Sequence, residues 1–351
     1  MSNTLFLLSD ATNNQKVELQ PLDSEEAIVG GIILNRIVGI AYDKLVPQNF
    51  NRETIKNLKF LKNYYHQQYI DFIEKLKYLS EIFKEANYNY CFLKGAFLIP
   101  TLYSPGQRIS NDIDLLINPC DASKVHSHLT GNGFVQGHCD EREVIIPATR
   151  KEIICSKMNS GETVPYLRYY NNILIEIDIN FSLDFKAKGS ENIVRDFLNK
   201  GERVIISDKI EFKTLQKQDF LIHLCCHLFK EATTYDWLVN RRDLMLYKFS
   251  DINMFLKKFA TQEFLTSLAN RIVELGLEKE CYYTFYNSSR IYPHIHNIIG
   301  FQNLLDTIKP ESTEYMFEII YPLKKAKYKY NISFEDWFSS ANRINHLIQE
   351  E

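Results

Sequence analysis

The sequence lacks the features of a secreted or membrane-spanning protein. Its seven cysteines are odd in number and include no Cys-x-x-Cys pair, so we expect reduced thiols and no disulfide framework. Residues 1–10 contain no basic segment followed by a long apolar run. No apolar stretch approaches the roughly 18 residues that cross a bilayer. We therefore expect a cytoplasmic protein without a membrane anchor.

An excess of positive charge is also absent. The chain has 41 Lys and Arg against 44 Asp and Glu, a net charge of −3, so long non-specific nucleic acid is not the expected partner. A zinc site is not expected either. His223 and His227 have i, i+4 spacing but lack the glutamate of a His-Glu-x-x-His motif, and two ligands do not make a zinc site. Packing between helices is the expected role of this pair, and a place for His227 near a nucleotide is the alternative.

Apolar spacing predicts an α+β fold, with a mixed sheet between helical regions. Strand-like pieces at 5–8 and 17–19 and helices at 24–46 and 52–86 make up a helical N-terminal lobe, residues 1–88. Residues 89–188 are predicted as an α/β core and 189–351 as a mostly helical domain. The core strands are predicted at 90–93, 113–117, near 134, 144–146, 152–155, 166–170 and 173–179, and core helices at 96–103 and 121–130. The later helices are predicted at 218–232, 236–260, 262–276, 279–288, 296–308 and 334–349.

The first chemical signal is an acidic pair in a strand. Asp112 and Asp114 are two residues apart, so both carboxylates project from one face of the strand, and Ile113 and Leu115 project from the other. Adjacent carboxylates repel each other unless a cation lies between them. Mg²⁺ prefers carboxylates together with substrate phosphates, and two such ions can hold both reacting oxygens of a phosphoryl transfer.

A phosphate-binding element precedes this pair. Lys94-Gly95 ends one predicted strand and opens a helix, where glycine allows backbone N–H groups to approach a phosphate and the helix N-terminus favours its charge. Lys94 is a candidate to contact the triphosphate, and Arg108 can hold another phosphate oxygen in a bidentate contact. Ser110 is placed in the same nucleotide-binding set.

A second acidic strand follows at 173–179. Glu176 and Asp178 alternate there with aliphatic residues, so pairing beside the first strand would complete a cluster of three carboxylates. Either residue could be the third metal ligand, and the carboxylate nearest an acceptor hydroxyl could serve as a general base.

The order of these features resembles the DNA polymerase β-like nucleotidyltransferase superfamily, and in particular its bacterial family of uncharacterised nucleotidyltransferases. The resemblance covers about residues 25–260, and two departures stand out. Ala96 follows Gly95 where the superfamily often has Ser or Gly, and Asp178 stands where this branch usually has His. The matching positions are Leu93-Lys94-Gly95-Ala96, Arg108, Asp112-Ile113-Asp114-Leu115-Leu116, 131–134, Glu176, His223-Leu224, His227-Leu228 and Asp251-Ile252.

The resemblance implies transfer of an NMP group from an NTP to an acceptor with two Mg²⁺ ions. Asp112, Asp114 and Glu176 are the implied catalytic residues, with Glu176 preferred over Asp178 by alignment. ATP is expected from its cellular abundance, and the acceptor is open: a small molecule, a peptide, a protein or a tRNA. The alternative is a non-catalytic nucleotide-sensing or protein-interaction module on the same fold.

A basic and aromatic run lies near the C-terminus. Residues 324–330 alternate lysine with tyrosine, a pattern that can bind an acidic or nucleotide-like acceptor. A solvated helix or loop face is the expected alternative.

Overall fold

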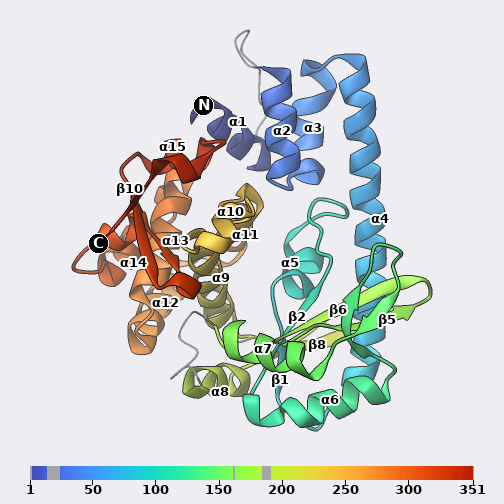
Figure 1. Ribbon diagram of the computed structural model, residues 1–351. Helices are drawn as coiled ribbons and strands as arrows, with labels where there is room; N and C mark the ends of the chain where they lie inside the picture. Colours follow the sequence, from blue (N-terminus) through green and yellow to red (C-terminus); the bar gives the residue numbers. More distant parts are fainter. Residues whose placement is uncertain (1, 14–23, 161–162, 184–190, 351) are drawn as a thin grey trace. The chain divides into compact units, whose positions relative to one another are not determined.

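The chain folds into two compact units in the computed structural model, which describes residues 2–13, 24–160, 163–183 and 191–350. The sheet unit is His66–Phe220, and the helical unit combines Met1–Tyr65 with Leu221–Glu351. Their boundaries fall within two continuous helices, α4 (Arg52–Phe83) and α9 (Lys217–Ala232) (Figure 1).

The sheet unit contains an eight-stranded mixed sheet in the order β4-β3-β5-β6-β2-β1-β8-β7. The central strand β2 runs parallel to β6 and antiparallel to β1. The predicted α+β class is therefore confirmed, but β7 and β8 lie in a region that was predicted to be mostly helical. The strands are β1 (Tyr90–Phe92), β2 (Ile113–Ile117), β3 (Val135–Cys139), β4 (Ile145–Pro147), β5 (Tyr166–Tyr170), β6 (Ile173–Asn180), β7 (Glu202–Ser207) and β8 (Ile210–Thr214).

An aliphatic face of β2 and β6 forms the core of this unit. Ile113, Leu115 and Ile177 are fully buried in one cluster with apolar residues of α4 such as Phe72 and Leu76. The same cluster includes residues of α6 (Ala122–Gly131), which follows the short helix η1 (Pro119–Asp121). Figure 1 shows α5 (Gly95–Leu102) above the sheet and α6 below it. Because side chains alternate along a strand, burying the isoleucines commits the intervening acids to the opposite face.

The β5–β6 hairpin confirms a turn that the sequence predicted. Asn171 and Asn172 have φ angles of 50° and 62°, the left-handed conformations that a two-residue hairpin turn needs and that asparagine tolerates. Residues 152–155, in contrast, were wrongly predicted as a strand and lie in α7 (Arg150–Ser160). Thr149 and Glu152 form a capping box there: the backbone N–H of Thr149 donates to Glu152 at 2.7 Å, and that of Glu152 donates to Thr149 Oγ1 at 3.3 Å.

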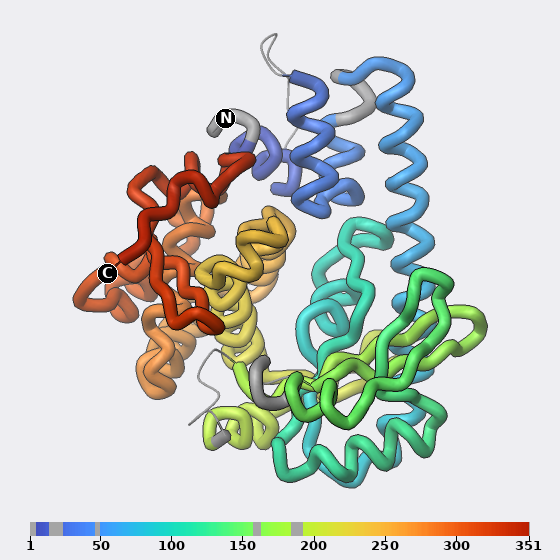
Figure 2. The backbone as a smooth tube through the Cα atoms, viewed as in Figure 1, coloured from blue at the N-terminus to red at the C-terminus, as the bar shows by residue number. Residues whose placement is uncertain are grey.

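The helical unit is mostly α-helical, and its C-terminal segment, red in Figure 2, adds a sheet of order β11-β10-β9. Its helices, besides parts of α4 and α9, are α1 (Ser2–Thr12), α2 (Glu25–Leu34), α3 (Val38–Asn49), α10 (Tyr235–Val239), α11 (Leu246–Phe259), α12 (Gln262–Leu275), α13 (Glu278–Ile291), η2 (Pro293–Asn297), α14 (Phe301–Ile308), η3 (Glu314–Phe317), η4 (Pro322–Lys324), α15 (Phe334–Ser339) and η5 (Arg343–His346). Its strands are β9 (Glu318–Tyr321), β10 (Ala326–Tyr330) and β11 (Leu347–Gln349).

Several predictions for this unit were wrong in detail. Residues 5–8 lie in α1, where Leu5, Leu8 and Ala11 are buried at helical spacing. The expected strand at 17–19 lies outside the described residues. One helix predicted over 24–46 is two, α2 and α3, and one over 236–260 is also two, α10 and α11. The last helix, expected to reach residue 349, ends at Ser339.

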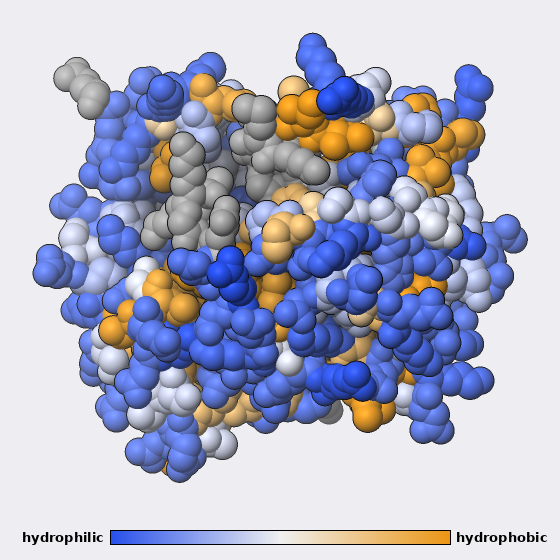
Figure 3. Space-filling view, turned by 90° about the horizontal axis from the view of Figure 1, so that it is seen from below, coloured by the Kyte–Doolittle hydropathy of each residue, from blue (hydrophilic) through white to orange (hydrophobic). Residues whose placement is uncertain are grey.

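Polar side chains cover most of the face drawn in Figure 3, and apolar ones form scattered patches between them. In the described part of the chain, no helix combines the length and the hydrophobicity needed to cross a membrane.

Candidate active site

Strands β2 and β6 bring the predicted acids together. The two strands are parallel, and Asp114 pairs in register with Asp178. Ile113 pairs with Ile177, so Asp112 and Glu176, each one residue earlier, are neighbours at the same end. The pairing of the two acidic strands that the sequence suggested is therefore present, and it sets two carboxylates of one strand beside two of the other.

We call the four carboxylates Asp112, Asp114, Glu176 and Asp178 the acidic face. Its negative charge is only partly compensated, as the pKa of Asp178 shows. Burial first, and then the charges of Asp112, Asp114 and Glu176, raise the pKa of Asp178 to about 8, whereas Lys94 opposes them. A carboxyl group in such surroundings holds a proton near neutral pH unless a cation replaces it. The acidic face therefore has the electrostatic character of a cation site.

Lys75 is a part of this region that the sequence analysis missed. It lies on α4, is 7% exposed, and donates to the backbone oxygen of Asn111 at 3.0 Å. Burial lowers the pKa of Lys75, and the negative charges of Glu176 and Asp112 oppose that shift. Burial also raises the pKa of Glu176, with Asp112 adding to the effect and Lys75 countering it. Glu176 thus has a nearby cation, Lys75 of α4. The sequence did not indicate this interaction, because the two residues lie far apart in the chain.

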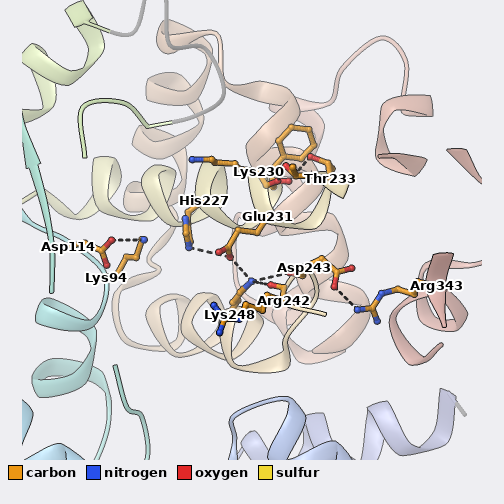
Figure 4. Close-up of polar contacts among 12 residues, drawn as sticks. Lys94, Asp114, His227, Lys230, Glu231, Thr233, Arg242, Asp243, Lys248 and Arg343 are labelled. Atoms are coloured by element: carbon orange, nitrogen blue, oxygen red, sulfur yellow. Dashed lines mark hydrogen bonds and ion pairs between the residues drawn. The ribbon is translucent and has the colours of Figure 1, made fainter. Parts of the chain in front are cut away.

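Lys94 forms an ion pair with one of the acids. Its Nζ lies 2.7 Å from Asp114 Oδ1 (Figure 4), and Asp114 is 5% exposed. Asn180 Nδ2, which the sequence analysis also missed, lies 3.4 Å from the same oxygen. Lys94 has a φ of 42°, uncommon for a residue with a side chain. This backbone geometry at the start of α5 places the ammonium group at the acidic face.

The backbone at Gly95 approaches the loop before β2 closely. A Cβ atom added at Gly95 would lie 2.9 Å from Ser110 Cβ, so a larger residue would have to displace the loop. Ser110 Oγ donates to Asp112 Oδ1 at 2.9 Å. Arg108 is 8% exposed and donates to the backbone oxygen of Ile109. The start of α5 and this loop therefore meet beside Asp112.

The residues offer suitable donors for Mg²⁺, but their side chains are not gathered around a metal position. In the described residues, no three His, Cys, Asp or Glu side chains converge closely enough to hold a metal ion. Lys94 contacts Asp114, and Ser110 contacts Asp112. The donor chemistry nevertheless fits, because the acidic face offers the hard carboxylate oxygens that Mg²⁺ prefers.

The other candidates from the sequence lie in the helical unit. His223 is 3% exposed on α9, and the His227 Nε2 atom lies 3.3 Å from Glu231. Of the 324–330 run, Lys327 and Lys329 lie in strand β10 and pair with glutamates: Lys327 lies 2.6 Å from Glu318, and Lys329 lies 2.5 Å from Glu350. The positive charge of this run is therefore partly neutralised within its own sheet.

A Lys-Gly helix start lies beside two paired acidic strands, the arrangement that the sequence analysis expected for a nucleotidyltransferase. The chain belongs to the family of uncharacterised nucleotidyltransferases, which matches residues 26–293. No curated protein matches the chain. One solved structure that matches is an antigenic nucleotidyltransferase-like protein from Paracoccidioides brasiliensis, with 15% sequence identity over 57% of this chain and 88% of that one. Its TM-score of 0.28 is too low to support a conclusion.

Proposed function

We propose that the protein transfers an NMP group from an NTP, with ATP the first candidate, to a hydroxyl group of an acceptor, and that it uses Mg²⁺. The main observation that supports this proposal is the register of β2 and β6, which sets Asp114 beside Asp178. Bound Mg²⁺ would supply positive charge to the triphosphate and to the attacking and leaving oxygens.

Asp112, Asp114 and Asp178 are the proposed metal ligands. Asp178 is preferred over Glu176 as the third ligand because the pKa of Asp178 responds to both acids of β2, whereas that of Glu176 responds to Asp112 and to Lys75. Glu176 is then the candidate general base for the acceptor hydroxyl, since its raised pKa favours proton uptake.

Lys94 and the start of α5 are proposed to hold the triphosphate. Lys94 forms an ion pair with Asp114. A phosphate oxygen of a bound nucleotide would be an alternative partner for the ammonium group of Lys94. Release of Lys94 would also free Asp114 Oδ1 for a metal. Gly95 keeps the backbone close to Ser110, and the N–H groups of the first turn of α5 are donors for phosphate. Arg108 completes the proposed set of nucleotide-binding residues.

Isothermal titration calorimetry with a non-hydrolysable ATP analogue and Mg²⁺ tests this function. The wild type should bind with micromolar affinity in the presence of Mg²⁺, and Asp112→Asn/Asp114→Asn should lose that binding. The double variant Asp208→Asn/Glu202→Gln makes the same change of charge at exposed positions of the sheet unit, and it should bind as the wild type does.

Two results would contradict the proposal. One is the absence of binding of any NTP with any divalent metal, and the other is binding that is unaffected by Asp112→Asn/Asp114→Asn. Nucleotide binding without transfer of the α-phosphate to any acceptor would favour the non-catalytic sensing module instead.

A further inference from the structure

A buried lysine interrupts the apolar side of helix α4 in the sheet unit. Lys75 follows Phe72 by three residues and precedes Leu79 by four, and these two core residues are 1% and 0% exposed. Residues three and four apart lie on the same side of a helix, so the pattern calls for an apolar residue at position 75. Lys75 is nevertheless 7% exposed. Burying an ammonium group is unfavourable unless a polar partner offsets it.

The partner of Lys75 is the backbone just before the first acid of the acidic face. Lys75 Nζ donates to the backbone oxygen of Asn111 at 3.0 Å, and Asn111 directly precedes Asp112. The negative charges of Glu176 and Asp112 also act on Lys75. The hydrogen bond therefore joins α4 to the loop that leads into β2, close to the acidic face.

Asp112 lies just outside the strand ladder. The pairing of β2 with β6 begins at Ile113, and its pairing with β1 begins at Leu115. Ladder hydrogen bonds fix the backbone of the residues within a strand. Asp114 lies within β2, and its backbone oxygen accepts from the N–H of Leu93 at 2.9 Å. The position of Asp112 depends instead on contacts of the loop before the strand.

A second contact reaches the same loop. Ser110 Oγ donates to Asp112 Oδ1 at 2.9 Å, and Ser110 lies close to Gly95 at the start of α5. Ser110 thus orients the carboxylate of Asp112, while Lys75 holds the backbone one residue earlier. The two contacts act on different parts of the same proposed metal ligand.

We propose that Lys75 is a positioning residue of the metal site, which holds the start of β2 so that Asp112 stays beside the other proposed ligands, Asp114 and Asp178. This inference rests on the proposed function, because it takes Asp112 to be a metal ligand. Lys75 acts through the backbone of Asn111 and needs no contact with the metal or the nucleotide.

Charge and position predict opposite effects of replacing Lys75 with a neutral residue. If only its charge mattered, the acidic face would become more negative and would bind a divalent cation more tightly. If Lys75 positions Asp112, loss of the hydrogen bond frees the loop and the cation binds more weakly. The direction of the change in metal affinity therefore distinguishes the two roles.

Three variants make this test. Lys75→Met removes the donor and the charge, and an unbranched, adaptable side chain suits the apolar side of α4. Lys75→Arg keeps a positively charged donor. Lys77→Met is the matched control: it removes the same charge from the same helix, at a half-exposed lysine whose ammonium group lies 3.4 Å from Glu74.

Electron paramagnetic resonance titration with Mn²⁺ alone measures the metal affinity. Lys75→Met should weaken Mn²⁺ binding by at least about tenfold. Lys75→Arg should bind Mn²⁺ within about threefold of the wild type, and Lys77→Met within about twofold.

Hydrogen–deuterium exchange tests the positioning role without any metal. Peptides that cover residues 105–115 should exchange faster in Lys75→Met than in the wild type, because a loop that has lost a hydrogen bond opens more often. The same peptides should match the wild type in Lys75→Arg and Lys77→Met. Peptides from β5 should be unchanged in every variant, since the sheet itself stays folded.

Equal or tighter Mn²⁺ binding in Lys75→Met would overturn the proposal, and so would unchanged exchange of residues 105–115. A Lys75→Arg variant as weak as Lys75→Met would show that the hydrogen bond to Asn111 is not the cause. Absence of Mn²⁺ binding by the wild type is a different failure. It would contradict the proposed function, and with it the metal-site role of Lys75, whereas the exchange experiment would still show whether Lys75 holds the loop.

Discussion

Two groups of buried charges in this protein are organised in opposite ways. In the helical unit two buried acids each face a cation: Asp243 lies 2.5 Å from Arg343, and Glu231 lies 2.5 Å from Lys248 (Figure 4). In the sheet unit the four acids of β2 and β6 outnumber the two lysines beside them, Lys94 and Lys75, and the pKa of Asp178 is raised to about 8, by burial first and then by three other carboxylates.

The difference separates charges that maintain the fold from charges that are suited to a ligand. Burying a paired charge costs less free energy than burying an isolated one, so a one-to-one ion pair needs no further counter-charge. In a cluster of carboxylates, the mutual repulsion is relieved only when a proton or an added cation is bound. Substitutions in the helical unit should therefore change stability, and substitutions in the acidic face should change binding.

The largest expected effect is on stability. Asp243→Ala leaves the guanidinium group of Arg343, 11% exposed, without its buried partner, and such a change destabilises proteins by about 3–5 kcal/mol. Urea unfolding should show this loss. The double variant Asp243→Leu/Arg343→Met removes both charges and should recover most of it. Equal loss in the single and the double variant would contradict the role assigned to the pair.

The next effect distinguishes the two acids of β6. Asp178→Asn should weaken binding of the Mg²⁺–ATP analogue by at least about tenfold, because it removes a proposed metal ligand, whereas Glu176→Gln should change it by less than about threefold. Calorimetry on both variants makes the comparison. The reverse order of effects would assign the third metal ligand to Glu176.

Lys94→Met separates nucleotide binding from metal binding. The substitution removes a proposed phosphate contact and frees Asp114 from its ion pair at 2.7 Å. Affinity for the ATP analogue should fall by roughly tenfold, and affinity for Mn²⁺ alone should stay equal or rise. A parallel fall of both affinities would show that Lys94 supports the acidic face instead of contacting phosphate.

A smaller effect concerns pH in the absence of metal. The pKa of Asp178 is raised in the folded state from 3.8 to about 8, so its contribution to stability is fully present below pH 4 and is lost as the pH rises through about 8. Asp178→Asn does not titrate there. In EDTA its Tm should exceed that of the wild type by at least roughly 2–4 °C at pH 8.5, the shift for about 1 kcal/mol, and the gap should close near pH 4. A difference in Tm between Asp178→Asn and the wild type that does not change with pH would contradict the raised pKa of Asp178.

The smallest effect is expected for the lysines of β10. Lys327 and Lys329 pair with Glu318 and Glu350 at the surface, and exposed pairs of this kind contribute little. Lys327→Ala/Lys329→Ala should leave affinity for the ATP analogue within about twofold of the wild type. A large loss of affinity would mean that the basic and aromatic run takes part in nucleotide binding after all.

Local sequence pattern was enough to predict the two acidic strands of the candidate site, and it failed where tertiary contacts decide the structure. Strands β2 and β5 begin and end where predicted, because alternating or continuous apolar runs mark buried strands. The run Ile153-Ile154 suggested a strand, but the capping box at Thr149 and Glu152 selects a helix. Lys75 was missed because its contact with Asn111 joins a helix to a distant loop, and no spacing within α4 indicates such a contact.

The most direct test of the central claim is electron paramagnetic resonance of Mn²⁺ added to the purified protein, with and without the ATP analogue. If the acidic face of β2 and β6 is a metal–nucleotide site, the signal of free Mn²⁺ should fall on addition of the wild-type protein and fall further with the nucleotide. With Asp112→Asn/Asp114→Asn it should match the signal of a solution without protein. A free Mn²⁺ signal that the wild type leaves unchanged, even with the nucleotide present, would contradict the account.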